Sequence, residues 1–306
     1  MRAAVVTSLG GPDVLRVVDV PDPVPGPGQV LVRVRAACVN PADVAARVGL
    51  LPGGADTPPF LPGWDIAGEI VTCGDDAGAF QVGDRVAGMI PWFLTRGAPG
   101  GYAELVAADP DWLAPVPAGL DLVAAATVPL NGLTAHQALD LLGPGVSADS
   151  TLLITGASGG VGAFAAQLAA RRGLRVLAVA SHDDQEWVRG LGVHTTLPRT
   201  TDLAALGPIP AVLDAVPVGE PAIAALADGG ALVATRPGPQ ADPARRIHQH
   251  VVMVHPDSGV LGALLRDAAA GLLHTRIAQT LPLTGAAQAH HLLEAGGLRG
   301  KVVLEP

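Results

Sequence analysis

Residues 1–122 carry short segments in which apolar and polar positions alternate. In residues 29–37 the apolar side chains fall on every second position, and Arg33 and Arg35 occupy positions between them. Successive side chains of a strand point to opposite faces, so this pattern predicts strands with one buried and one solvated face. Turns rich in glycine and proline separate the segments, which predicts a partly open β-barrel. The predicted strands cover 1–6, 14–20, 29–37, 63–71, 83–90 and 100–106, with a helix after Asn40 and a loop over 49–62.

The pattern changes near residue 122, where helical patterns begin to alternate with short apolar runs. Such alternation predicts a parallel, doubly wound α/β sheet. The last segment is expected to return to the first domain, because the doubly wound half is complete before it. We therefore predict one domain of residues 1–122 and 262–306 and a second domain of residues 123–261. The strands predicted for the second domain are 152–155, 174–180, 194–197, 211–214, 231–235 and 248–254.

A glycine cluster lies between the first strand and the first long helix of the second domain. The strand ends at Thr155, the alanine-rich helix runs to about Ala169, and a second strand follows at βαβ distance. Glycine permits positive φ in a tight turn and lets the backbone approach a pyrophosphate, which the helix N-terminus then attracts. This arrangement predicts a dinucleotide-binding loop. Its residues are Gly156, Ala157, Ser158, Gly159, Gly160, Val161 and Gly162.

The same loop also matches the G-x-S-x-G pattern of a hydrolase nucleophile elbow, with Ser158 as the nucleophile. A hydrolase needs an acid and then a histidine at later strand ends. Asp214 and His255 are available there, but no motif marks them. Gly162, which would lie under a cofactor, favours nucleotide binding.

Composition narrows the class of protein. The 306 residues are 49% hydrophobic with a net charge of −9 and no basic run, so nucleic acid is not an expected partner. We find no apolar stretch long enough to span a bilayer and no signal-peptide pattern, which predicts a cytoplasmic protein. Cys38 and Cys73 form no C-x-x-C pair, so a structural zinc site of four cysteines is excluded.

Several motifs together resemble the medium-chain dehydrogenase/reductase superfamily, and within it the zinc-free quinone oxidoreductase group. The resemblance covers nearly the whole chain and implies a GroES-like catalytic domain, a Rossmann domain and a cleft that holds a nicotinamide dinucleotide for hydride transfer. The motifs are Val39–Asp43, Leu61–Gly68, Val82–Val86, Gly101–Glu104, Ala126–Ala135, Ala157–Gly162 and Gly300–Leu304.

The resemblance also implies that zinc is absent. Zinc alcohol dehydrogenases of the superfamily place a cysteine ligand where this chain has Asn40 and a histidine where it has Trp64. Without a Lewis acid to hold an alkoxide, alcohol oxidation loses its electrophile. Reduction of a conjugated carbonyl needs less help, because the charge delocalises over the enone or quinone. We therefore expect a reductase of a quinone or α,β-unsaturated ketone.

Further roles follow from matching family positions. Asn40 resembles the active-site asparagine near the nicotinamide ribose and the substrate oxygen, and Thr127 the threonine beside the nicotinamide carboxamide. Gly238 is expected to line the nicotinamide side. Trp64 and Trp92 are candidates for the substrate pocket.

Cofactor choice depends on the end of the second Rossmann strand. Ser181 and His182 occupy the ribose position, where NAD-binding enzymes usually place a carboxylate, and Asp183 is close enough in sequence to compete for that role. No arginine or lysine lies between Arg175 and Arg189 to hold a 2′-phosphate. The family favours NADPH, with Ser181 as a donor, and NAD(H) is not excluded.

Two alternatives stay open because related enoyl-thioester reductases often carry a tyrosine after the Asn-Pro segment, and this chain has none there. One is an enoyl-thioester reductase, which the missing tyrosine disfavours. The other is a redox-silent member that binds or cyclises a natural-product intermediate. The family further implies a homodimer formed by edge-to-edge pairing of the strand that begins at His248.

Overall fold

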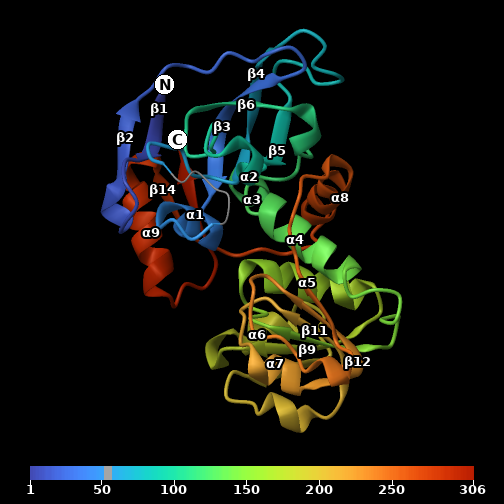
Figure 1. Cartoon of the computed structure of the whole chain (residues 1–306). Coiled ribbons are helices and arrows are strands. Elements are labelled where there is room, and N and C mark those ends of the chain that lie inside the picture. The colour runs from blue at the N-terminus through green and yellow to red at the C-terminus, as the bar shows by residue number, and fades with distance from the viewer. Residues whose placement is uncertain (52–56) are drawn as a thin grey trace. The chain divides into compact units, whose positions relative to one another are not determined.

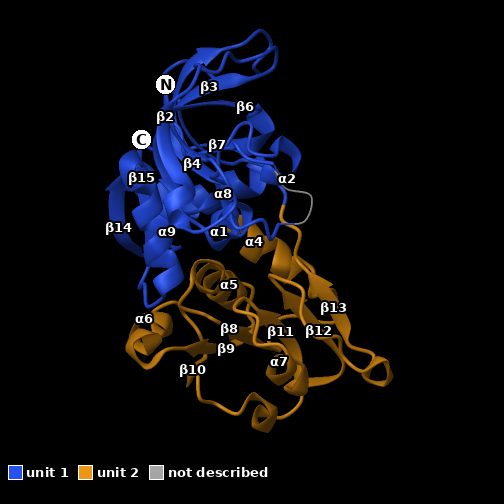
Figure 2. Cartoon of the chain, turned by 60° about the vertical axis from the view of Figure 1, so that its left-hand side comes forward, with its two compact units in different colours: residues 1–130, 255–306 blue, residues 131–254 orange. Residues whose placement is uncertain are grey.

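The computed structural model describes residues 1–51 and 57–306, which form two compact units. Unit 1 consists of residues 1–130 and 255–306, and unit 2 of residues 131–254. Figure 2 colours the two units, and Figure 1 labels their elements. The predicted domain limits at 122 and 262 stay a prediction. Part of the predicted loop 49–62, residues 52–56, lies outside the described residues.

Unit 1 is built around a curved, largely antiparallel sheet. Its strands follow the order β14-β15-β3-β4-β5-β7, and β6 also pairs with β3. The alternation of residues 29–37 appears in β3, where Arg33 and Arg35 are exposed between buried aliphatic side chains. The strands are β3 (Val30–Cys38), β4 (Asp65–Cys73), β5 (Arg85–Met89), β6 (Leu105–Ala108), β7 (Leu113–Pro115), β14 (Ile277–Pro282) and β15 (Lys301–Glu305), with a separate pair of β1 (Arg2–Val6) and β2 (Leu15–Asp19).

Among the described residues, five α-helices belong wholly to unit 1, and a sixth crosses into unit 2. α9 packs against β14 and β15, α8 against β7, and α3 against β3 and β4. The helices are α1 (Pro41–Arg47), α2 (Trp92–Thr95), α3 (Leu122–Ala125), α8 (Ser258–Ala269) and α9 (Ala286–Ala295), while α4 (Pro129–Asp140) spans the boundary between the units.

Unit 2 contains a parallel sheet of six strands in the order β10-β9-β8-β11-β12-β13. This order reverses between β8 and β11, which is the topological switch point of a doubly wound sheet. The predicted α/β fold class is therefore confirmed. The elements are β8 (Thr151–Thr155), α5 (Gly160–Arg171), β9 (Arg175–Ala180), α6 (Gln185–Arg189), β10 (Thr195–Pro198), β11 (Ile209–Asp214), α7 (Glu220–Ala224), β12 (Leu226–Ala234) and β13 (His248–Val251).

One predicted strand differs clearly from the structure. β6 begins only at Leu105, and in residues 100–104 Ala103 forms an isolated antiparallel bridge with Ala3 of β1 in place of a regular strand. A Cβ on Gly100 would lie 2.2 Å from the carbonyl oxygen of Leu61. The glycines that were expected to begin a strand therefore serve a close approach between two loops. The described helices include none that is long and apolar enough to cross a membrane.

Candidate functional site

The glycine loop of unit 2 connects β8 to α5 and has the geometry of a phosphate cradle. Gly156 adopts φ +60°, and α5 begins at Gly160. A Cβ on Gly162 would lie 2.2 Å from the carbonyl oxygen of Gly156, so only glycine lets the helix pack this closely on the loop. The first N–H groups of the 12-residue helix α5 have no partners within the helix and favour an anion. The loop therefore fits the pyrophosphate of a dinucleotide.

Asp214 ties this loop to the segment that follows β11. Its buried carboxylate accepts the Thr155 hydroxyl at 2.6 Å and the backbone N–H groups of Val218 and Gly219 at 3.0 and 3.3 Å. Thr155 is the residue immediately before Gly156. The carboxylate thus connects the ends of β8 and β11 beside the switch point. These contacts give Asp214 a structural role, rather than the role of the acid in a hydrolase triad.

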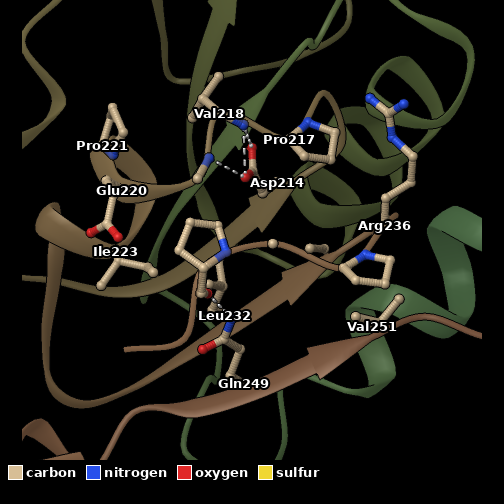
Figure 3. Close-up of a pocket in the computed structure, with 15 residues that line it drawn as sticks. Asp214, Pro217, Val218, Glu220, Pro221, Ile223, Leu232, Arg236, Gln249 and Val251 are labelled. Atoms are coloured by element: carbon tan, nitrogen blue, oxygen red, sulfur yellow. Dashed lines mark hydrogen bonds between the residues drawn. The ribbon is translucent and has the colours of Figure 1, made fainter. Parts of the chain in front are cut away.

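A cavity of about 540 Å³ opens at the carboxyl ends of β11, β12 and β13. Gly238 lines it, as do Asp214, Arg236 and Gln249 (Figure 3). Ligands of open α/β sheets bind outside the carboxyl ends of the strands. The position of Gly238 in this cavity is compatible with its predicted place beside a nicotinamide.

The ribose end of the predicted cofactor site lies at the end of β9. The Ser181 hydroxyl donates to Asp184 at 2.8 Å, and the side chain of His182 is 97% exposed next to Asp183. Pro198 of β10 is in register with Ala180 of β9, so Arg199 follows its strand at the level where Ser181 follows its own. Residues 175–189 of the sequence do not include this cation, because strand pairing, and not sequence distance, brings Arg199 to the level of Ser181.

Asn40 of unit 1 lies just before α1 in a buried polar network. Its Nδ2 donates to the carbonyl oxygen of Cys38 at 3.1 Å and to Asp65 Oδ2 at 2.8 Å. Its Oδ1 accepts from Lys301 Nζ at 2.7 Å. The side chain is only 1% exposed. The amide is therefore held from both ends, which is more than a helix-capping residue requires.

Two buried carboxylates brace this network. Asp43 accepts the N–H groups of Asn40 and Gly63, each at 2.8 Å, and Asp65 accepts the N–H of Leu130 at 2.6 Å. Burial raises the pKa of both Asp43 and Asp65 to about 7, although their hydrogen bonds and the charge of Lys301 act in the opposite direction. Burial also raises the pKa of Cys38 to about 12, so this thiol is a neutral core group.

Thr127 is fully buried near the end of α3. Its Oγ1 lies 2.7 Å from the carbonyl oxygen of Ala124, to which it donates, and 3.1 Å from Oγ1 of Thr275. The contact joins the segment after α3 to the segment that precedes β14. The predicted role of Thr127 beside a nicotinamide stays a prediction.

Trp64 and Trp92 belong to an aromatic cluster with Phe60 and Phe93. The ring centroids of Trp64 lie 6.1 Å from Trp92 and 5.0 Å from Phe93. The indole N–H of Trp92 donates to the carbonyl oxygen of Leu61 at 2.9 Å, whereas the buried Nε1 of Trp64 has no hydrogen-bond partner among the residues that the structure describes. A buried donor without an acceptor is costly and rare, so Trp64 is the better candidate to meet an oxygen of a ligand.

The predicted residues divide between the units. Asn40, Trp64, Trp92 and Thr127 lie in unit 1, whereas the glycine loop, Ser181, His182 and Gly238 lie in unit 2. Within residues 1–51 and 57–306, no group of three or more His, Cys, Asp and Glu side chains is arranged to hold a metal ion. That the protein works without zinc stays a prediction.

Two family models match the chain. Residues 26–118 match an alcohol dehydrogenase GroES-like domain, and residues 191–304 match a zinc-binding dehydrogenase domain. Human quinone oxidoreductase is 38% identical over 196 residues, which cover 63% of this chain and 57% of that protein. A chloroplastic quinone-oxidoreductase homolog of Spinacia oleracea is 34% identical over 193 residues, or 61% and 57% of the two chains. The matched region thus spans little more than half the length of these relatives.

Solved structures match over the whole chain. The quinone oxidoreductase from Coxiella burnetii has a TM-score of 0.88 and 30% identity, with coverage of 100% of this chain and 99% of that one. An alcohol dehydrogenase superfamily protein from Novosphingobium aromaticivorans has a TM-score of 0.86 with the same identity and coverage.

Proposed function

Because the chain belongs to the medium-chain dehydrogenase/reductase superfamily and resembles its quinone oxidoreductases, we propose that it reduces a quinone or an α,β-unsaturated ketone with NADPH and without zinc. The observation that carries the proposal is that each unit holds one of the two sites that hydride transfer needs. Unit 2 has a glycine cradle that a Cβ at Gly162 would fill, and unit 1 holds Asn40 in a buried polar network.

The bound nicotinamide would supply the hydride. The residues of this chain would bind the cofactor, orient the reacting groups and exclude water. The N–H groups at the start of α5 would hold the pyrophosphate. The cavity beside Gly238 would take the nicotinamide end. Asn40 and Thr127 would orient the reacting groups, and Trp64 with its aromatic neighbours would exclude water from an apolar acceptor ring.

Three features support NADPH over NADH. Ser181, not a carboxylate, follows β9. The carboxylate of Asp184 accepts the Ser181 hydroxyl and is 5% exposed, so it is engaged within the protein rather than offered to a ribose. Arg199 supplies a cation at the level of Ser181, and guanidinium groups bind phosphate well.

We also propose that two copies pair through β13 and that the protein works in the cytoplasm. β13 is the last strand of the unit 2 sheet and pairs with β12 on one side. Its other edge carries backbone groups suited to a strand from a second copy. Cys38 and Cys73 are both free thiols, which fits a reducing compartment.

The direct test mixes the purified protein with NADPH and a panel of quinones and enones. Consumption of NADPH is followed by the loss of its absorbance, with and without a metal chelator. Turnover of at least one acceptor that survives chelation supports the proposal. Tight NADPH binding without turnover of any acceptor would overturn it, and loss of activity on chelation would overturn its zinc-free part.

A further inference from the structure

Lys301 is the only lysine in the chain, which also contains eighteen arginines. A chain that uses arginine at every other cationic position has one place where a compact ammonium stands instead. That place is the candidate reduction site, where Lys301 Nζ lies 2.7 Å from Oδ1 of Asn40.

Backbone pairing brings the lysine there from the far end of the sequence. β15 pairs antiparallel with β3, with Val303 opposite Cys38 and Leu304 opposite Ala37. The Val39 N–H donates to the carbonyl oxygen of Val302 at 2.9 Å, which extends this pairing one step toward Asn40. The sheet thus fixes the backbone of Lys301, and the contact with Asn40 holds its Nζ.

The contacts of Asn40 allow only one orientation of its carboxamide. The Nδ2 group faces the carboxylate of Asp65 and the carbonyl of Cys38, and Oδ1 faces the ammonium of Lys301. A flipped amide would place its NH2 group against the ammonium and its oxygen against the carboxylate. The contact of the NH2 group with the ammonium would be repulsive, and so would the contact of the oxygen with Asp65 when that carboxyl is ionised. The ammonium and the ionised carboxylate therefore select the same orientation.

A compact ammonium suits this position better than a guanidinium. Lys301 is half-buried, and its charge lies close enough to oppose the effect of burial on Asp43 and Asp65. In the described chain it forms no ion pair within 4.0 Å. Its ammonium donates to the neutral amide of Asn40 and also interacts with the thiol of Cys38. The planar fork of arginine would favour a bidentate contact with a carboxylate instead.

We propose that Lys301 is a positioning residue for hydride transfer, which holds the Asn40 carboxamide, together with Asp65, in a single orientation. The inference rests on the proposed function, because it assumes that Asn40 acts in the reaction. Lys301 itself is not assigned a contact with the substrate.

Steady-state kinetics on three variants test this role. Lys301→Met is expected to lower kcat by about tenfold or more while the KM for NADPH changes by less than about twofold, because misplacing a positioned group costs rate rather than cofactor affinity. Lys301→Arg keeps the charge and the donors and is expected to recover part of the loss. Arg33→Met removes one exposed cation from β3 and serves as the charge-matched control with unchanged kinetics.

The single lysine permits a second readout that does not depend on turnover. Protein made with [ε-13C]lysine gives one lysine side-chain NMR signal, from Lys301. The signal is expected to shift in Asn40→Ala and Asp65→Asn and to stay in place in Arg33→Met. If the Lys301 signal has the wild-type chemical shift in both Asn40→Ala and Asp65→Asn, the proposed contact between Lys301 and Asn40 is wrong.

The two readouts separate the inference from the proposed function. Wild-type protein that reduces no acceptor contradicts the proposed function, whatever the NMR signal does. If the wild type is active and Lys301→Met keeps its kcat, the inference fails while the proposed function stands. A Lys301→Met variant that is less stable but retains its kcat also overturns the inference, since Lys301 is then only a structural brace.

Discussion

The phenol of Tyr102 and the imidazole of His290 face each other inside unit 1, with Oη 3.2 Å from Nε2 and the rings edge to face. Tyr102 and His290 are 0% exposed, and within residues 1–51 and 57–306 Nδ1 of His290 has no hydrogen-bond partner. His290 lies on α9. Its burial makes it structural, because a histidine on the inner face of α9 packs against the Gly-Tyr-Ala-Glu segment.

The first prediction concerns stability in acid. Burial lowers the pKa of His290 from 6.5 to about 3, so the folded protein excludes a proton that the unfolded chain binds. Because of His290, the free energy of unfolding therefore decreases as the pH falls from about 6.5 toward 3. The double variant Tyr102→Phe/His290→Leu should lose less stability over this range than Tyr102→Phe alone. Urea unfolding at a series of pH values measures the difference.

Comparison with the single variant matters because Asp43 and Asp65 act in the opposite direction. Burial raises the pKa of each to about 7, so they keep protons that the unfolded chain releases above about 4, and they remove stability as the pH rises. Both variants retain these carboxylates. If the free energy of unfolding has the same pH dependence in the single and double variants, His290 binds its proton equally well in the folded and unfolded states, and the prediction is wrong.

The second prediction concerns the glycine cradle. Gly162→Ala would place a methyl group 2.2 Å from the Gly156 carbonyl oxygen, so either the loop or the start of α5 must move. We expect NADPH affinity to fall by about tenfold or more, which corresponds to about 1.4 kcal/mol. Gly145→Ala, whose new Cβ would meet nothing within 4 Å, is the matched control. Equal dissociation constants for the two variants, measured by calorimetry, would refute the role of the cradle.

The fold was predictable because its signals are local. The alternation in β3 and the strand, glycine turn and helix around Gly156 each lie within one short segment, and the parallel order of unit 2 follows from their repetition. The irregular segment at Gly100 was harder to predict, because the reason for its glycines lies in the loop at Leu61. Sequence pattern alone does not show such a close approach.

The candidate site was predictable only in its family positions. Asn40 was identified because it resembles the active-site asparagine of the family. Its partners Asp65 and Lys301 come from β4 and β15, and no spacing rule links Asn40 to Lys301. Arg199 was missed for the same reason, since register between β9 and β10 brings it level with Ser181. Long-range pairing in the sheets therefore assembles the polar groups that the sequence could not connect.

The third prediction contrasts two tryptophans of one aromatic cluster. Trp64→Phe and Trp92→Phe remove the same atoms, but in the described part of the chain only the indole of Trp92 has a hydrogen-bond partner, the Leu61 carbonyl oxygen. We expect Trp92→Phe to be less stable than Trp64→Phe by about 1–2 kcal/mol, because it leaves that oxygen unpaired. We expect Trp64→Phe instead to raise the KM for the acceptor. Thermal unfolding and steady-state kinetics check the two effects, and a reversed order of stability would contradict the assignment.

The fourth prediction concerns the choice between NADPH and NADH. Arg199 is exposed, follows β10 at the level of Ser181, and forms no ion pair in the part of the chain that the structure describes. Arg199→Gln should reduce kcat/KM for NADPH by about tenfold, since a charge-assisted contact to the 2′-phosphate contributes about 1.5–3 kcal/mol, and leave kcat/KM for NADH nearly unchanged. Arg189→Gln on α6 removes the same charge elsewhere in unit 2 and controls for net charge. The ratio of the two kcat/KM values is the measurement. A ratio that falls equally in both variants would attribute the effect to net charge, and a ratio unchanged in Arg199→Gln would remove Arg199 from the cofactor site.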